Sequence, residues 1–126
     1  MCFLKSIPMD KLKKLIANGD AARTEIEDGD ANTKDVFPVL HVRAGASAQW
    51  LLSEYDEVQQ TFFGLCDLGL GFPEMGYVAL SDLDELTGVA TPEINGAFEA
   101  HARLSTYAKA AHNRECIVLN VTPDET

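Results

Sequence analysis

Cys66 and Asp67 are adjacent residues of this 126-residue chain whose types could support nucleophilic catalysis. A cysteine attacks as a thiolate, and a neighbouring cation is what normally stabilises that charge. No lysine or arginine stands between Arg43 and Arg103, so the sequence offers Cys66 no such cation nearby. We therefore expect Cys66 to be a buried structural thiol rather than a nucleophile.

A divalent metal site is the other chemistry that the residue types allow. Carboxylate oxygens suit Mg²⁺, Ca²⁺ or Mn²⁺, and a histidine can complete such a site. If neighbouring strands met, the ligands would come from His41, Glu54, Asp56, Asp67 and Glu74. No spacing fixes this geometry, and the three histidines form no H-E-x-x-H pair. We expect solvated acids and no cofactor, with the metal site as a weaker alternative.

The segment FGLCDLGLGFPEMG at residues 63–76 is rich in glycine but does not match a phosphate-binding loop. It lacks the Lys-Ser/Thr pair of such loops, and its G-x-G at residues 69–71 lacks the spacing that follows in a dinucleotide fold. The glycines are expected to permit turns. Phe72 stands between Gly71 and Pro73, where an aromatic side chain is easily presented to a partner.

Acidic residues dominate the 59 positions between Arg43 and Arg103, where no base stands. The ten acids there are Glu54, Asp56, Glu57, Asp67, Glu74, Asp82, Asp84, Glu85, Glu93 and Glu99. The formal net charge of the whole chain is -10. A field of this sign repels nucleic acid and attracts basic protein surfaces or cations.

Size and composition favour one soluble domain over residues 1–126. No apolar stretch approaches the roughly 20 residues that span a bilayer, and the N-terminus has no secretory pattern. Three cysteines without a C-x-x-C spacing argue against a disulfide framework. These features predict a cytoplasmic protein with reduced thiols.

The elements that must position these residues begin with a helix at about residues 6–18, capped by Ser6 and ended by Gly19. An acidic, solvated loop is expected at residues 20–35. The sheet-rich body, residues 36–121, should hold strands at 38–44, 48–57, 60–68 and 77–80.

A short helix with a capping-box start at Ser81 is expected next, ending at Gly88. It should be followed by a strand at 97–101, a helix at 104–112 and a strand at 116–121. The short connections favour antiparallel pairing. We predict a single α+β domain, with about four to six mainly antiparallel strands and two or three helices packed on them.

The chain resembles the DUF2958 family, small bacterial proteins of uncharacterised function. Three segments carry the resemblance: QWLLSEYDE at 49–57, FGLCDLGLGFPEMGYVALSDLDEL at 63–86 and LSTYAKAA at 104–111. It covers about residues 8–112, and departs from the family pattern at His41 and after Gly88. Such proteins are typical of plasmids, phages and integrative elements, so the resemblance implies an accessory protein of a mobile element. It implies no mechanism.

The charge pattern favours a non-enzymatic binding protein that engages a basic surface of a nucleic-acid-handling protein. An inhibitor of a host defence nuclease, of restriction or CRISPR type, would be one concrete form. The expected binding residues are Glu54, Asp56, Glu57, Asp82, Asp84 and Glu85 as charge, with Phe72 as an apolar anchor.

Two alternatives stay open. A small hydrolase or nuclease could use a carboxylate-bound metal, and an enzymatic role is the less favoured one. A self-assembling accessory protein could pair through a sheet edge, for example through CIVLNV at residues 116–121.

Overall fold

The structure is a computed structural model that describes residues 3–27, 36–86 and 90–121, with the side chains of residues 23–27 left undescribed. It contains one five-stranded sheet, in which every strand pairing is antiparallel, together with three α-helices. The predicted α+β class is therefore confirmed. Within the described residues, no helix is long and apolar enough to cross a membrane.

The sheet has the strand order β4-β3-β2-β1-β5, so β2 lies at its centre and β4 and β5 form its edges. The strands are β1 (Leu40–Ala44), β2 (Ala48–Asp56), β3 (Thr61–Asp67), β4 (Glu74–Ala79) and β5 (Glu93–Ile94). The first four follow one another through short connections. The sequence locates β1 to β3 to within two residues at each end, whereas β4 begins at Glu74 rather than at the predicted Tyr77, and Leu80 belongs to α2.

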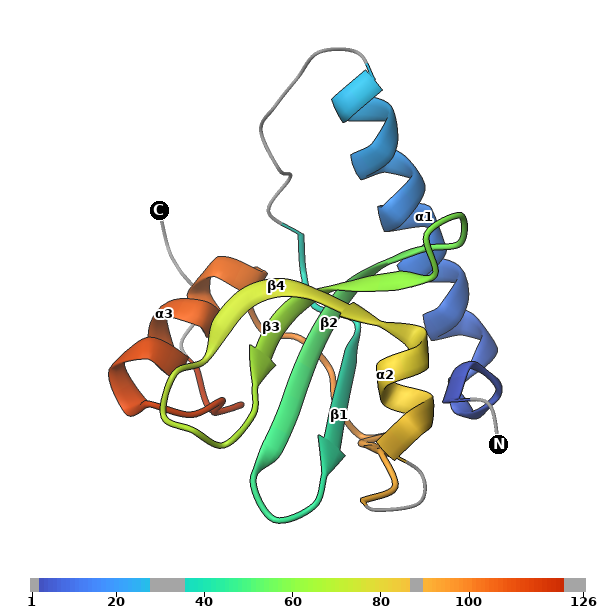
Figure 1. Cartoon of the computed structure of the whole chain (residues 1–126). Coiled ribbons are helices and arrows are strands. Elements are labelled where there is room, and N and C mark those ends of the chain that lie inside the picture. The colour runs from blue at the N-terminus through green and yellow to red at the C-terminus, as the bar shows by residue number, and fades with distance from the viewer. Residues whose placement is uncertain (1–2, 28–35, 87–89, 122–126) are drawn as a thin grey trace.

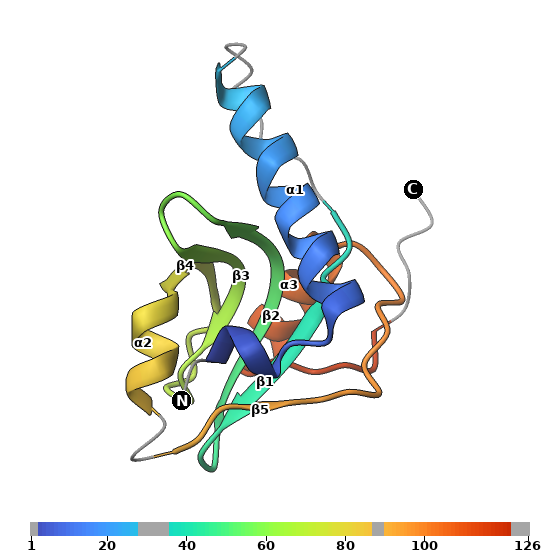
Figure 2. The same ribbon diagram turned by 90° about the vertical axis from the view of Figure 1, so that its right-hand side faces the viewer.

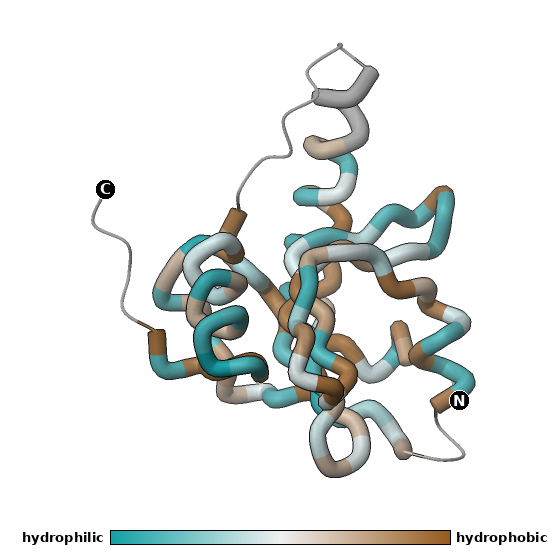
Figure 3. Tube along the Cα trace, turned by 60° about the vertical axis from the view of Figure 1, so that its left-hand side comes forward, coloured by the Kyte–Doolittle hydropathy of each residue, from teal (hydrophilic) through white to brown (hydrophobic). Residues whose placement is uncertain are grey.

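Helices cover both faces of this sheet. Helix α1 (Met9–Glu27), the 3₁₀ turn η1 (Phe3–Ser6) and α2 (Leu80–Glu85) lie on one face, while α3 (Leu104–Arg114) lies on the other (Figure 1). Two buried clusters result, one around Leu15, Trp50 and Phe62 and one around Leu51 and Tyr107. We call the two sides of the sheet the α1 face and the α3 face. Brown, hydrophobic positions alternate with teal, hydrophilic ones along much of the described chain (Figure 3).

Helix α1 does not end at Gly19, which corrects the predicted end at residue 18. It continues to Glu27, and its later turns extend beyond the sheet (Figure 2). A Cβ atom at position 19 would collide with the carbonyl oxygen of Tyr55, so glycine lets α1 approach the backbone of β2 closely. The predicted loop at 20–35 is thus helical in its first part, and residues 28–35 lie outside the described ones.

Helix α2 forms without the predicted capping box, and its N-cap lies two residues before the predicted cap at Ser81. Its N-cap is Ala79, which makes no side-chain cap hydrogen bond. Asp84, the expected capping acid, instead accepts a hydrogen bond from the backbone N–H of Phe3 at 2.6 Å. The acid therefore ties the N-terminal turn to α2, and the predicted end at Gly88 lies outside the described residues.

Two predicted strands in the C-terminal third are wrong. Residues 97–101 and 116–121 are irregular, and the fifth strand is the short β5 at Glu93–Ile94. Helix α3 forms as predicted and extends two residues further, to Arg114. Apolar residues in the irregular segments pack onto the α3 face as loops, which the alternation of apolar residues alone cannot distinguish from strands.

Replacing Gly19 by alanine should destabilise the protein, although alanine is the better helix former by about 1 kcal/mol. The added methyl group would meet the Tyr55 carbonyl, and overpacking of this kind costs about 1–3 kcal/mol. Urea unfolding of Gly19→Ala measures the change. The exposed Ala17 on the same helix supplies the control, because Ala17→Gly should cost only about 1 kcal/mol. A more stable Gly19→Ala protein would show that the close approach is absent.

Candidate functional site

The predicted acidic residues gather at one end of the β3–β4 hairpin. A backbone hydrogen bond of 3.0 Å, from the N–H of Leu80 to the carbonyl oxygen of Gln60, holds the β2–β3 turn beside the start of α2. Glu57 on that turn and Asp82 and Glu85 on α2 are exposed. We call Glu57, Asp82 and Glu85 the acidic end of the molecule.

The other three predicted acids have structural contacts. Asp56 is half-buried, and its Oδ1 accepts hydrogen bonds from the backbone N–H groups of Val58 and Gln59 at 2.9 and 3.2 Å. Asp84 binds the N-terminal turn, and Glu54 is only 8% exposed at an irregularity in β2. The carboxylates best placed to meet a partner are therefore those of the acidic end.

An apolar groove adjoins the acidic end on the α1 face of the sheet. Its volume is about 310 Å³, and Trp50, Cys66, Leu68, Tyr77, Val78, Asp82, Leu83 and Leu86 line it. It exists because the neighbouring positions on β3 and β4 are small: Cys66 on β3 and Gly76 on β4 share this face with Val78. A Cβ atom added at Gly76 would meet no atom within 4 Å. Asp82 thus places a carboxylate at the rim of an apolar hollow.

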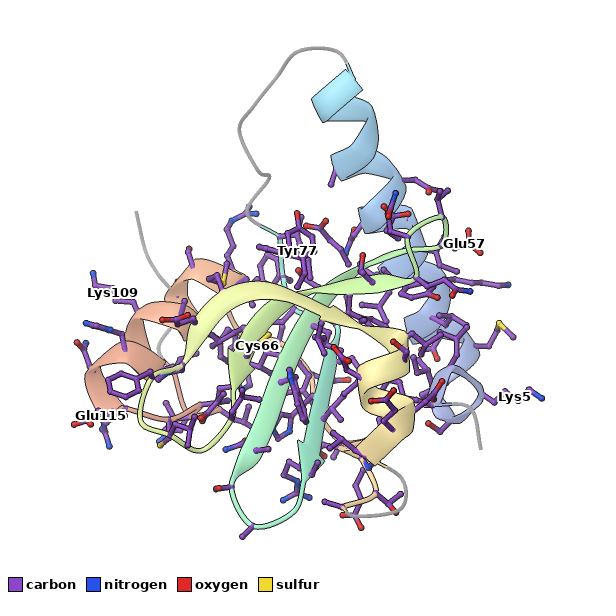
Figure 4. The ribbon with its side chains drawn as sticks, in the orientation of Figure 1. Lys5, Glu57, Cys66, Tyr77, Lys109 and Glu115 are labelled. Carbon is purple, nitrogen blue, oxygen red and sulfur yellow. The ribbon has the colours of Figure 1, made fainter. Side chains whose placement is uncertain are left out.

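Phe72 lies at the other end of the hairpin, away from the acidic end. The six paired positions of β3 and β4 span about 17 Å at the usual rise of a strand. Position 71, beside Phe72, lies near Glu115, and Figure 4 shows Glu115 and Glu57 on opposite sides of the molecule. The predicted anchor is strongly exposed, at 77%, but it does not share one compact site with the predicted acids.

The residues proposed as ligands in the weaker alternative, a metal site, do not come together in the described part of the chain. Asp67 is 1% exposed and accepts hydrogen bonds of 2.9 Å from the backbone N–H groups of Gly69 and Ile117. Glu74 lies exposed at the start of β4, opposite Cys66. In the part of the chain that the structure describes, no three His, Cys, Asp or Glu side chains are grouped so as to hold a metal ion.

His41 lies at the floor of a second, polar groove of about 710 Å³, beside Arg43, Gln49, Glu93 and Asn95. Its Nδ1 accepts a hydrogen bond from the amide Nδ2 of Asn95 at 3.1 Å, because an amide nitrogen only donates. Its Nε2 therefore carries the proton and donates to Oε1 of Gln49 at 2.9 Å. Burial lowers the pKa of His41 below the ordinary 6.5, the nearby Arg43 acts in the same direction, and the Gln49 bond opposes both.

Cys66 is only partly buried, whereas the sequence predicts a fully buried structural thiol. It is half-buried, visible among the strands in Figure 4, and burial raises its pKa to about 11. Its sulfur lies 4.0 Å from the carbonyl oxygen of Gly76. Cys66 is thus protonated at neutral pH and serves as a small apolar lining of the groove.

The sequence did not predict the groove itself. It requires α2 to fold back over β3 and β4, a long-range arrangement that periodicity does not encode. The one signal available was the pair of small residues, Cys66 and Gly76, in otherwise apolar strands.

In a Cys2→Ser protein, thiol alkylation at neutral pH should be fast at one site and slow at the other. Cys116 is exposed, whereas the thiolate of Cys66 is rare because its pKa is about 11. Mass spectrometry of tryptic peptides over a time course measures both rates. Equal rates at Cys66 and Cys116 would contradict the burial of Cys66.

Acidification should destabilise the protein in a way that depends on His41. Its folded pKa is lowered, so the unfolded chain binds more protons and the free energy of unfolding falls as pH drops below 6.5. In His41→Gln the loss between about pH 7.5 and pH 5.5 should be smaller than in the parent, as measured by urea unfolding. The exposed His101, changed to Gln, is the matched control for the substitution. An unchanged slope in His41→Gln would contradict the assignment.

The comparisons with known proteins give a family. No curated protein and no solved structure matches the chain. A family model described as a protein of unknown function (DUF2958) matches residues 6–118. This match includes all of the strands, α2, α3 and the acidic end, and it covers nearly the whole sequence. The chain therefore belongs to the DUF2958 family.

Proposed function

We propose that the protein is a non-enzymatic binding protein whose acidic end and adjoining apolar groove engage a basic surface of a partner protein. The observation that carries the proposal is the position of Asp82 at the rim of the apolar groove, with Glu85 and Glu57 close by. Such a surface complements an apolar side chain flanked by lysine or arginine. The apolar contact supplies affinity and the carboxylates supply specificity and a fast encounter.

Charge distribution supports a partner that itself handles nucleic acid. Such proteins carry basic grooves for phosphates, and carboxylates on a rigid scaffold can occupy them. The 59 residues without a base provide that scaffold. In its concrete form the protein acts in the cytoplasm as an accessory of a mobile genetic element and inhibits a defence nuclease of the restriction or CRISPR type.

Neutralising the acidic end should abolish capture of the partner. The triple variant Glu57→Gln, Asp82→Asn, Glu85→Gln removes three exposed carboxylates. Immobilised protein is incubated with host lysate at about 50 mM and about 500 mM salt, where screening differs strongly. We expect basic, nucleic-acid-binding proteins to be retained at low salt, released by high salt or competing DNA, and lost in the triple variant.

The matched control changes three exposed acids elsewhere, in the variant Glu74→Gln, Glu93→Gln, Glu99→Gln. Both triple variants alter the net charge by the same amount, so a site-specific surface predicts loss only in the first. Equal loss in both would show that total charge, rather than the acidic end, holds the partner. Capture that survives in both would contradict the role of the carboxylates.

The groove has its own test within the same capture experiment. A leucine at Gly76 has room for its Cβ atom and would project onto the face of the sheet that carries the groove. Gly76→Leu should therefore fold and lose the partner at low salt.

A further inference from the structure

Strand β4 is an open edge of the sheet. It pairs with β3 through six positions, and within the described residues no other strand pairs with its outer side. An edge of this kind presents backbone N–H and C=O groups that can pair with another strand, and proteins usually protect it with lysine, proline or a bulge. The six residues of β4 contain no lysine, proline or bulge, and Glu74 at the first position is their one charged residue.

The same region carries most of the exposed apolar side chains of the described structure. Eight large apolar residues are strongly exposed, and five of them lie between residues 68 and 77: Leu68, Leu70, Phe72, Met75 and Tyr77. Tyr77 is 71% exposed. Within the described residues its ring contacts one other aromatic ring, that of Phe63, with 4.9 Å between the ring centroids. We call the loop 68–73 together with β4 the β4 edge.

Charge is sparse on the β4 edge. Residues 68–81 contain one charged residue, Glu74, among fourteen positions, while 24% of the whole chain is charged. Two molecules with a net charge of -10 repel each other and can approach most easily where acids are fewest. A basic partner, by contrast, is drawn toward the acidic end. The β4 edge is thus suited to a second copy of the chain.

We propose that two copies associate through β4 in an antiparallel, two-fold symmetric pairing that joins their sheets into one. A two-fold axis perpendicular to the sheet keeps corresponding side chains on the same face. The pairing is then centred on Gly76 or on Tyr77, and in both registers Met75 and Tyr77 form one apolar stripe across the contact.

Both registers also separate the like charges. Glu74 of each copy faces Val78 of the other in the first register and lies beside the start of the other copy's α2 in the second. The two Glu74 side chains lie about 13 to 20 Å apart along the strands. This distance exceeds the screening length of about 8 Å at physiological salt. The antiparallel arrangement also brings the loop 68–73 of each copy to the far end of the other copy's β4, beside the start of α2.

Sedimentation and light scattering of the purified full chain test the proposal. We expect a reversible dimer of twice the 13.7 kDa chain mass, with a dissociation constant on the order of micromolar to tens of micromolar. The dimer should strengthen as salt rises, because both copies are acidic. This is opposite to the salt dependence of the proposed basic partner, so failure of one idea is distinguishable from failure of the other.

Tyr77→Lys places a charge on the edge and should weaken the dimer at least about tenfold. Val58→Lys makes the same kind of change at a residue that is 73% exposed on the β2–β3 turn and should leave the dimer intact. A monomer at all concentrations up to about 200 µM would overturn the proposal, since weak dimers populate there. A dimer unaffected by Tyr77→Lys would also overturn it.

Hydrogen exchange of the unmodified protein gives an answer that needs no variant. Amides of residues 74–79 should become more protected as the protein concentration rises, whereas those of β5 should not change. Protection at β4 that is independent of concentration would exclude the pairing.

Discussion

The structure depends on covering the central strand β2 on both of its faces. Six consecutive residues of β2, from Trp50 to Tyr55, are buried. Trp50 and Leu52 belong to the cluster under α1, while Leu51 belongs to the cluster under α3. Because neither face can meet water, the chain must supply a helical layer on each side, and the close approach of α1 at Gly19 is one consequence.

Buried polar groups organise the α3 face where helix α3 does not cover it. The carboxylate of Asp67 accepts the N–H of Ile117, so a side chain takes the hydrogen bond that a neighbouring strand would otherwise take. This explains why the apolar run at 116–121 is fixed on the sheet without becoming a strand. Gln49, opposite Asp67 in the sheet, lies within 3.5 Å of the Ile117 carbonyl and also binds His41. The C-terminal segment is therefore held by side chains from the two central strands.

Local patterns in the sequence were enough for the bounds of β1 to β3 and for the existence of β4, α2 and α3. The elements from β1 to α2 follow one another through short connections, and α3 has a clear helical spacing of apolar residues. They were insufficient wherever a distant residue decides the outcome. Gly19 resembles a helix stop in the sequence, but in the structure it lets α1 approach the backbone of Tyr55. Asp84 resembles a capping acid, but it accepts a hydrogen bond from the backbone N–H of Phe3. The sequence names six acids for the candidate site, and the structure leaves three of them exposed: Glu57, Asp82 and Glu85. Which of them are exposed depends on the hydrogen bonds of Asp56 and Asp84, and these require the fold.

The exposed apolar residues of the β4 edge contribute little to the stability of the isolated chain. Leu68, Leu70 and Phe72 are more than half exposed, so they contribute little burial to the folded monomer, and apolar surface left in water is not stabilising. Their exposure is not imposed by the sheet either, since polar residues would satisfy a turn between β3 and β4 equally well. A surface of this kind acquires a stabilising role only when another surface covers it. The scarcity of charge there, in a chain that is acidic elsewhere, then determines which surface can come close.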